Sequence, residues 1–194
     1  MKYTVPTGYS GGLVPPAIVV HAVNARTTSP PSGTPSLTSG LLVVFDLGGS
    51  SAGTDMTKVS DFSDPANPFN RVVTVSSTYP PASEGWIYGV CVSDCPSVGD
   101  FVNVQLTGVV ECNVYAIKAT VPPRTWDAGS VVYAAPSSAD GSAQLPDGLI
   151  FAGSGSAAVG ILLESFTLSG GAGSSAVIKR KILLSGYTLG TAAG

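Results

Sequence analysis

The chain has 194 residues, of which 44% are hydrophobic and only 11% charged, and its formal net charge is -3 at pH 7. A chain that is this apolar and this weakly charged is not expected to be disordered. Its nine basic residues are too few to supply the cationic surface that nucleic acids require. Its 24 glycines and 15 prolines interrupt it too often for a helical bundle. The composition therefore favours an all-β protein with little helix, built as a small β-barrel or sandwich.

Residues 1–37 are predicted to form an extended N-terminal arm, because glycines and prolines recur along them. An apolar run at 17–23 fits one strand, which must be covered by its own domain or by a neighbouring subunit. No basic region precedes an apolar core here, so an export signal is not expected. The apolar run is also too short to cross a bilayer, and no membrane partner is expected.

Residues 38–92 are predicted to form a β-rich subregion. β-Branched and apolar residues between turn signals predict strands at 41–46, 71–76 and 86–92. Gly89, inside the last of these strands, is expected to mark a bulge or a close contact with a neighbouring strand. One or two helical turns are expected at 54–62, where Thr54 or Asp55 can cap the helix.

Residues 93–185 are predicted to form the main β-barrel or sandwich, followed by a C-terminal tail at 186–194. Apolar residues alternate with polar ones at 102–106 and again at 110–116, which indicates two half-buried strands. Thr107-Gly108 separates the two runs, so we expect a β-hairpin that turns at these two residues. Further strands are expected at 130–134, 149–151, 159–164 and 176–184.

The three cysteines and the single histidine are the first candidates for chemistry. The odd number and the spacing of Cys91, Cys95 and Cys112 fit neither a disulfide framework nor a closed four-ligand zinc site. We therefore expect reduced, buried thiols that pack as small hydrophobic side chains, and no metal. His21 is expected to be structural, because no nucleophile pattern accompanies it.

Two alternatives to a purely structural protein remain open in the sequence. Trp86 and Trp126 could stack on sugars in a tail, fibre or carbohydrate-binding module, although core or interface packing suits them better. Two of the glutamates Glu84, Glu111 and Glu164 could act as the acid pair of a hydrolase, but no spacing singles out a pair.

Two further patterns give no chemistry. The glycine-rich loop at 171–176 matches a loose dinucleotide-binding form but leads into a strand instead of a helix. The basic run 179–181 is expected to be the solvated part of a strand. We therefore expect no catalytic residues, no cofactor and no enzymatic activity.

The second half of the chain also carries a pattern found in a known family. Its segments are Gly108-Val109-Val110-Glu111, Ala128-Gly129-Ser130-Val131-Val132-Tyr133, a turn around Asp140-Gly141, Ala158-Val159-Gly160-Ile161-Leu162-Leu163-Glu164, and the strand from Val177 to Leu184. In these segments, between Phe101 and Leu184, the chain resembles the head decoration (capsid cement) proteins of tailed bacteriophages. The resemblance covers somewhat under half of the chain.

This resemblance implies a small β-rich homotrimer without catalytic residues, made in the host cytoplasm and located on the outer capsid surface of the virion. It implies that the trimer stabilises the head by bridging subunits of the major capsid protein, without direct contact with nucleic acid. Under this hypothesis, contacts with the capsid or between subunits are expected from the arm and from one later strand, at Tyr3, Tyr9, Leu13, Ile18, Val20, Ile161 and Leu163.

Overall fold

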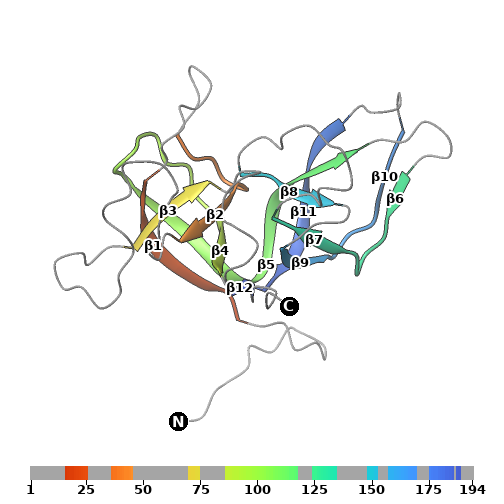
Figure 1. Ribbon diagram of the computed structural model, residues 1–194, viewed down its shortest axis with the longest axis horizontal. Helices are drawn as coiled ribbons and strands as arrows, with labels where there is room; N and C mark the ends of the chain where they lie inside the picture. Colours follow the sequence, from red (N-terminus) through yellow and green to blue (C-terminus); the bar gives the residue numbers. More distant parts are fainter. Residues whose placement is uncertain are drawn as a thin grey trace, which may run out of the picture.

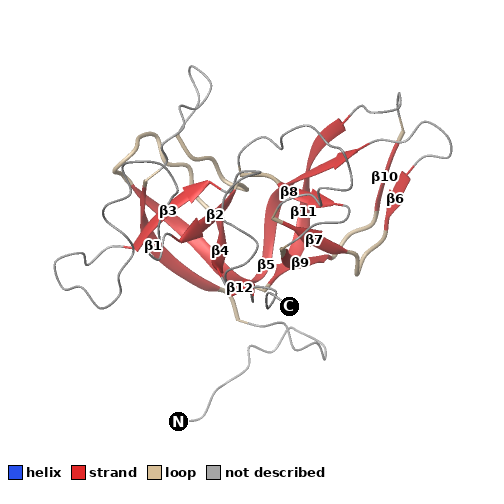
Figure 2. Ribbon diagram, viewed as in Figure 1, coloured by secondary structure: helices blue, strands red, loops and turns tan. Residues whose placement is uncertain are grey.

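The computed structural model describes residues 16–25, 36–45, 70–74, 86–117, 124–134, 148–152, 157–169, 175–185 and 187–188. This described part contains strands and no helix, which confirms the predicted all-β fold (Figures 1 and 2). The strands are β1 (Ile18–Asn24), β2 (Leu42–Phe45), β3 (Asn70–Thr74), β4 (Trp86–Cys91), β5 (Phe101–Ile117), β6 (Arg124–Trp126), β7 (Val131–Tyr133), β8 (Ile150–Ala152), β9 (Ala158–Leu162), β10 (Phe166–Leu168), β11 (Ser175–Leu184) and β12 (Tyr187–Thr188).

Five strands close into a first, mixed barrel. The N-terminal part of β5, residues 101–107, pairs antiparallel with β1, and β1 pairs in parallel with β3. β3 then pairs with β2, β2 with β4, and β4 returns to β5, all antiparallel. Closing the sheet on itself leaves few unpaired strand edges in this part of the molecule.

β5 then continues into a second closed ring. Residues 108–117 pair antiparallel with β11, β11 pairs with β9, β9 with β7 and β7 with β8. β8 returns to β5 in parallel. A single strand of 17 residues therefore belongs to both barrels, and Figure 1 shows it running from one group of strands to the other.

The two barrels have the same topology. In each barrel, the first strand in chain order pairs in parallel with the third strand. The other four pairings are antiparallel. They join the third strand to the second, the second to the fourth, the fourth to the fifth and the fifth back to the first. The registers agree outside two local shifts, at Ile18/Val19 and at Val132/Tyr133, so most positions in one ring have a counterpart in the other. Buried counterparts are Ala22 and Cys112, Val43 and Val132, Val72 and Ile150, Cys91 and Leu162, and Val104 and Ile182.

The turn that precedes the second strand of each barrel is repeated too. Gly40 and Gly129 both have a φ of 93°, a left-handed conformation that glycine adopts at little cost. The N–H of Gly40 donates to the Cys91 carbonyl, and the N–H of Gly129 donates to the Leu162 carbonyl, each over 2.8 Å. The repeat therefore preserves backbone geometry although most of the corresponding side chains differ.

A glycine in the fourth strand lets the fifth strand approach closely in both barrels. A Cβ atom at Gly89 would collide with the side chain of Val104, and one at Gly160 would collide with the carbonyl oxygen of Leu183. The close contact expected at Gly89 is confirmed, and Gly160 has the same role in the second barrel.

One end of each barrel is closed by the connections that precede its second and fifth strands. In the first barrel, Leu37 and Cys95 exchange two backbone hydrogen bonds of 3.0 and 2.8 Å. In the second barrel, β6 pairs with β10, and Trp126 lies opposite Phe166. Their rings stack with centroids 4.9 Å apart, and the Trp126 Nε1–H donates to the Ala152 carbonyl over 3.0 Å. Such stacking adds about 0.5–1.5 kcal/mol beyond the burial of the rings.

The core consists of two clusters of buried side chains. One fills the first barrel and includes Phe45, Val72 and Val104. The other fills the second barrel and also takes in side chains from the outer side of the first barrel, such as Leu42 and Val90. The barrels therefore share a packed interface as well as a strand.

One sequence-based prediction is wrong. Residues 102–106 and 110–116 do not form a hairpin, because Thr107-Gly108 lies inside the continuous strand β5, and Gly108 adopts a φ of 90° without reversing the chain. The strand expected at 17–23 corresponds to β1, which lies within the first barrel of its own chain, one of the two placements that the sequence left open. The two barrels meet within β5, near residues 107–108. The helical turns expected at 54–62 lie outside the described residues.

Gly160→Ala is expected to lower the free energy of unfolding by about 1–3 kcal/mol, because the added methyl group overlaps the Leu183 carbonyl and one strand must shift. Urea unfolding followed by circular dichroism measures the change. Ala158→Ser is a matched control on the exposed part of the same strand and should change stability by less than about 0.5 kcal/mol. Wild-type stability in Gly160→Ala would contradict the close approach of β9 and β11.

Candidate functional site

The contact residues predicted from the sequence fall into three groups. Tyr3, Tyr9 and Leu13 lie outside the described residues. Val20 faces inward from β1, opposite Val104, and packs against the first core. Ile18, Ile161 and Leu163 reach the surface, where Ile18 and Leu163 are exposed and Ile161 is half-buried. Of these, Ile18 and Ile161 belong to one continuous apolar surface.

The first part of this surface is a row across four neighbouring strands of the second barrel. Val109 on β5 lies opposite Leu183 on β11, Leu183 opposite Ile161 on β9, and Ile161 opposite Val131 on β7. Residues opposite each other in antiparallel strands point to the same face. Val109 and Val131 keep 38% and 40% of their surface exposed, so the row faces solvent.

The first barrel extends the row through β1. A register shift between Ile18 and Val19 places Ile18 opposite Thr107 and Val19 opposite Gln105, so both side chains face outward on the same side of β5. They are 49% and 50% exposed. We call the whole surface the apolar band, and it consists of Ile18, Val19, Val109, Val131, Ile161 and Leu183.

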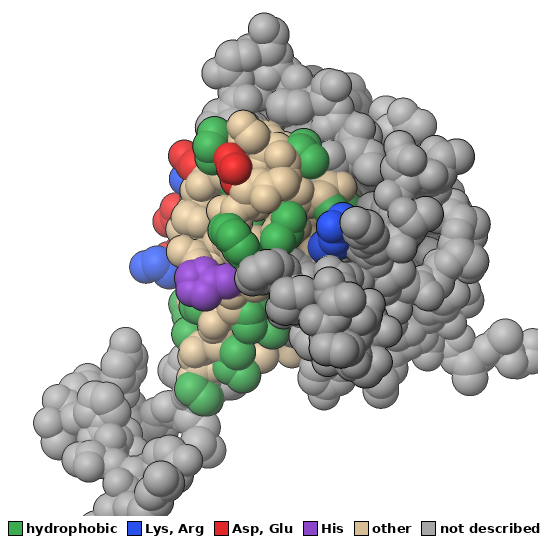
Figure 3. Space-filling view, turned by 90° about the vertical axis from the view of Figure 1, so that its left-hand side faces the viewer, with side chains coloured by type: hydrophobic (Ala, Val, Ile, Leu, Met, Phe, Trp, Pro, Cys, Tyr) green, Lys and Arg blue, Asp and Glu red, His purple; other side chains and the backbone are tan. Residues whose placement is uncertain are grey.

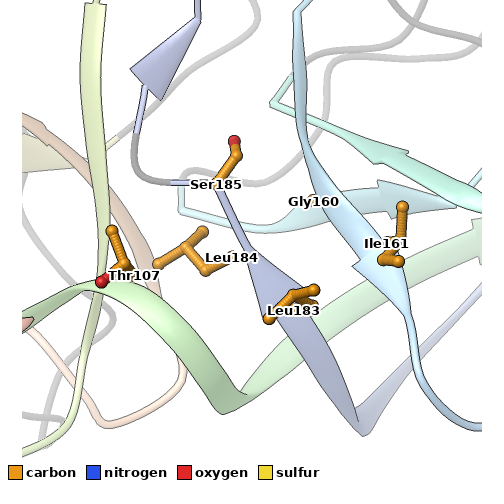
Figure 4. Close-up of a pocket in the computed structure, with 6 residues that line it drawn as sticks. All are labelled: Thr107, Gly160, Ile161, Leu183, Leu184 and Ser185. Atoms are coloured by element: carbon orange, nitrogen blue, oxygen red, sulfur yellow. The ribbon is translucent and has the colours of Figure 1, made fainter. Parts of the chain in front are cut away.

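A hollow lies within the apolar band at the junction of the barrels (Figure 4). It has a volume of about 280 Å³ and is lined by Thr107, Gly160, Ile161, Leu183, Leu184 and Ser185. Its lining is mostly apolar and carries no charged side chain. The hollow is therefore suited to receive an apolar side chain, and it lacks the converging acids and bases of a catalytic site.

Two ion pairs lie beside the apolar band on the same outer face. Lys179 Nζ is 3.8 Å from Glu111 Oε1, and Lys181 Nζ is 3.8 Å from Glu164 Oε1, with all four side chains exposed. Glu111 and Glu164, proposed from the sequence as possible catalytic acids, are thus each paired with a lysine on an open sheet surface. Glu84 lies outside the described residues.

Three of the four counterparts of this row in the first barrel are buried; the fourth, Val19, corresponds to Val109 and is exposed. Leu42 corresponds to Val131, Val90 to Ile161, and Gln105 to Leu183. Leu42 and Val90 are fully buried in the cluster that fills the second barrel. The same position in the fold is therefore covered in one barrel and open in the other.

Another face of the molecule lies on the side of β1 and β3. Figure 3 shows hydrophobic side chains in small groups on this face.

The three cysteines are free and buried, as predicted. Burial raises the pKa of Cys91 from 9.0 to about 12, helped by Cys95 and Asp94 nearby, and burial with Glu111 raises that of Cys112 to about 12. His21 lies on β1 opposite Asn103, with its side chain exposed. Within the described ranges, no three histidine, cysteine or acidic side chains come together in a way that could hold a metal ion.

Trp126 is only 6% exposed and is stacked in the closure of the second barrel, so its faces do not form a platform for sugars. Trp86 begins β4, and its side chain lies outside the described part.

In the basic run 179–181, the lysines face solvent as predicted. Arg180 points inward, and its guanidinium lies 5.2 Å from the centre of the Phe166 ring.

Sequence reasoning missed Val109, Val131 and Leu183, because an apolar residue in a strand has the same pattern whether a neighbour covers it or not.

No helix long and apolar enough to span a membrane occurs among the residues that the structure describes. No family model matches the chain, and no curated protein matches it. The site therefore has to be interpreted from its own geometry.

The buried thiols of Cys91 and Cys112 predict a loss of stability at alkaline pH. Their pKa values are raised in the folded state, so the full contribution is present below about pH 9 and is lost progressively as the pH rises from 9 towards 12. Each thiol should lower the free energy of unfolding by about 1 kcal/mol per pH unit in that range. Urea unfolding of wild type and Cys112→Ala between pH 8 and 11 tests this, with a shallower slope expected for the variant. Parallel curves would contradict it.

Proposed function

We propose that this chain is a virion structural protein, a capsid decoration or cement protein that binds the outer capsid surface as a homotrimer. It stabilises the head by bridging subunits of the major capsid protein. The observation that carries the proposal is the apolar band, an exposed apolar surface on a rigid pair of closed barrels.

The apolar band has the chemistry of a protein-docking surface. Its six aliphatic side chains lie on five paired strands, so they are held in place before binding and lose little conformational entropy on contact. Covering each half-exposed aliphatic side chain contributes on the order of 1 kcal/mol. Single contacts of this size are weak, but a multimer on a repeating lattice multiplies them by avidity.

The barrel pair also suits a load-bearing role. The two rings share β5 and a packed interface, so pulling the barrels apart means uncovering that interface and detaching one part of β5 from its ladder in one ring. A cement protein that resists internal pressure needs this kind of stiffness between its contact points. The resemblance of the segment from Phe101 to Leu184 to decoration proteins supports the same proposal.

Ile161→Asp is expected to reduce binding to capsids at least tenfold, because it places a carboxylate in the centre of the apolar band. Binding is measured by co-sedimentation of purified chain with empty shells of the major capsid protein encoded with it. Val177→Asp is the control for the added charge, because Val177 is an exposed aliphatic residue on β11, outside the apolar band. Absence of wild-type binding to these shells would overturn the proposed function.

Deleting residues 1–15 is expected to weaken capsid binding while leaving both barrels folded. The deletion removes Tyr3, Tyr9 and Leu13 and stops before β1, whereas a deletion through residue 23 would remove a strand of the first barrel. Co-sedimentation measures the binding, and the midpoint of thermal unfolding checks the fold. If the truncated chain binds as the full chain does, the arm has no role in the capsid contact.

A further inference from the structure

We infer that the ribbon formed by β6 and β10 is a second binding surface, which takes an extended acidic segment of a partner protein as an added strand. Figure 1 shows this ribbon at one end of the molecule, beside the second barrel. None of its residues belongs to the apolar band. The inference therefore goes beyond the proposed function and does not depend on what the apolar band binds. Three features of the described residues support it.

The first feature is the length of the ribbon. In the internal repeat, the pair of Trp126 and Phe166 corresponds to the bridge between Leu37 and Cys95. In the described part of the first barrel, that bridge stands alone and suffices to close this end. In the second barrel, two further residue pairs continue the ribbon beyond the stacked rings. The ribbon is therefore longer than closure of the barrel requires.

The second feature is an unprotected edge. As far as the structure describes the chain, β6 and β10 pair only with each other. In an antiparallel pair, alternate residues point their N–H and C=O groups away from the partner strand, so both strands present backbone groups to solvent. Pro96 of the first barrel has no N–H, whereas its counterpart Thr167 has one. Thr167 and Thr125 are exposed and face each other across the ribbon, with their hydroxyl oxygens 2.9 Å apart. Such an edge can pair with a further strand.

The third feature is positive charge without a matching acid. The guanidinium of Arg124 lies 5.1 Å from the centre of the Trp126 ring, and that of Arg180 lies 5.2 Å from the centre of the Phe166 ring. The ion pairs among the described residues involve neither arginine. The Arg180 Nε is also buried without a hydrogen-bond partner, so water compensates this charge poorly. Arg124 is exposed, and its guanidinium can bind a carboxylate through two parallel hydrogen bonds.

Together these features define the chemistry of the partner. An extended polypeptide can add to the edge through main-chain hydrogen bonds, and acidic side chains at alternate positions can face the two guanidiniums. A basic segment would be repelled by the same charges. A nucleic acid carries negative charge but has no peptide groups with which to extend the sheet. The ribbon therefore favours an acidic polypeptide.

The test uses the full-length chain and a dye-labelled peptide with blocked ends, Thr-Glu-Val-Glu-Val-Glu-Thr. Fluorescence anisotropy measures its binding at protein concentrations up to about 1 mM. One control peptide has lysine in place of each glutamate. The other has proline in place of each valine, which keeps the carboxylates but removes backbone donors. The acidic peptide is expected to bind about tenfold or more tightly than either control, and to slow amide hydrogen exchange in β6 or β10.

Arg124→Glu is expected to weaken binding of the acidic peptide about tenfold or more, because it reverses the charge beside the ribbon. Lys181→Glu is the matched control, because it makes the same change in net charge at an exposed lysine of β11, outside the ribbon. It should change the affinity by less than about threefold. Circular dichroism checks the fold, and Arg124→Gln replaces Arg124→Glu if that variant does not fold.

Three results would overturn the inference: no binding of the acidic peptide, equally tight binding of the proline peptide, or equal losses of affinity in Arg124→Glu and Lys181→Glu. The second and third results would mean that charge alone attracts the peptide. Capsids take no part in this experiment, so failure of the chain to co-sediment with capsids overturns the proposed function and leaves this inference standing.

Discussion

The structure depends on one strand that two closed sheets have to share. β5 supplies the fifth strand of the first barrel and the first strand of the second, so neither ring closes without it. Its inward positions fill both cores, and its outward positions form one continuous face across the junction. For this reason Thr107 and Val109 bring the apolar residues of β1 next to those of β11, and the apolar band spans both barrels.

The shared strand also explains how one topology appears twice in a chain without obvious sequence repetition. What each barrel needs at corresponding places is a backbone property: a left-handed turn at Gly40 and Gly129, and a missing Cβ atom at Gly89 and Gly160. Inward positions require only an apolar side chain that fits, so Ala22 can correspond to Cys112 and Cys91 to Leu162. Physical equivalence persists although residue identity does not.

Local patterns in the sequence predicted most of the strands but not their connections. Alternation located both parts of β5, yet it could not distinguish a glycine that reverses the chain from Gly108, which lets the strand pass from one barrel to the next. The partners in space decide between these outcomes, and β1 and β11 are far away in sequence. β6 and β10 were missed because three residues are too few to show a period, although Trp126 and Phe166 close the second barrel.

The functional surface was predicted only in part, for a related reason. Ile18 and Ile161 were proposed from the sequence, but Val90 and Ile161 are both aliphatic residues of a fourth strand, and only packing separates the buried one from the exposed one. The same fold position is an internal interface in the first barrel and an open surface in the second. The proposed function rests on this difference.

The most direct test is electron cryomicroscopy of capsid shells that have been incubated with the purified chain. The account predicts additional density on the outer surface of the shell, with the apolar band at the junction of the two barrels in contact with the shell. Shells without added density, or bound copies whose barrel junctions face solvent, would contradict it.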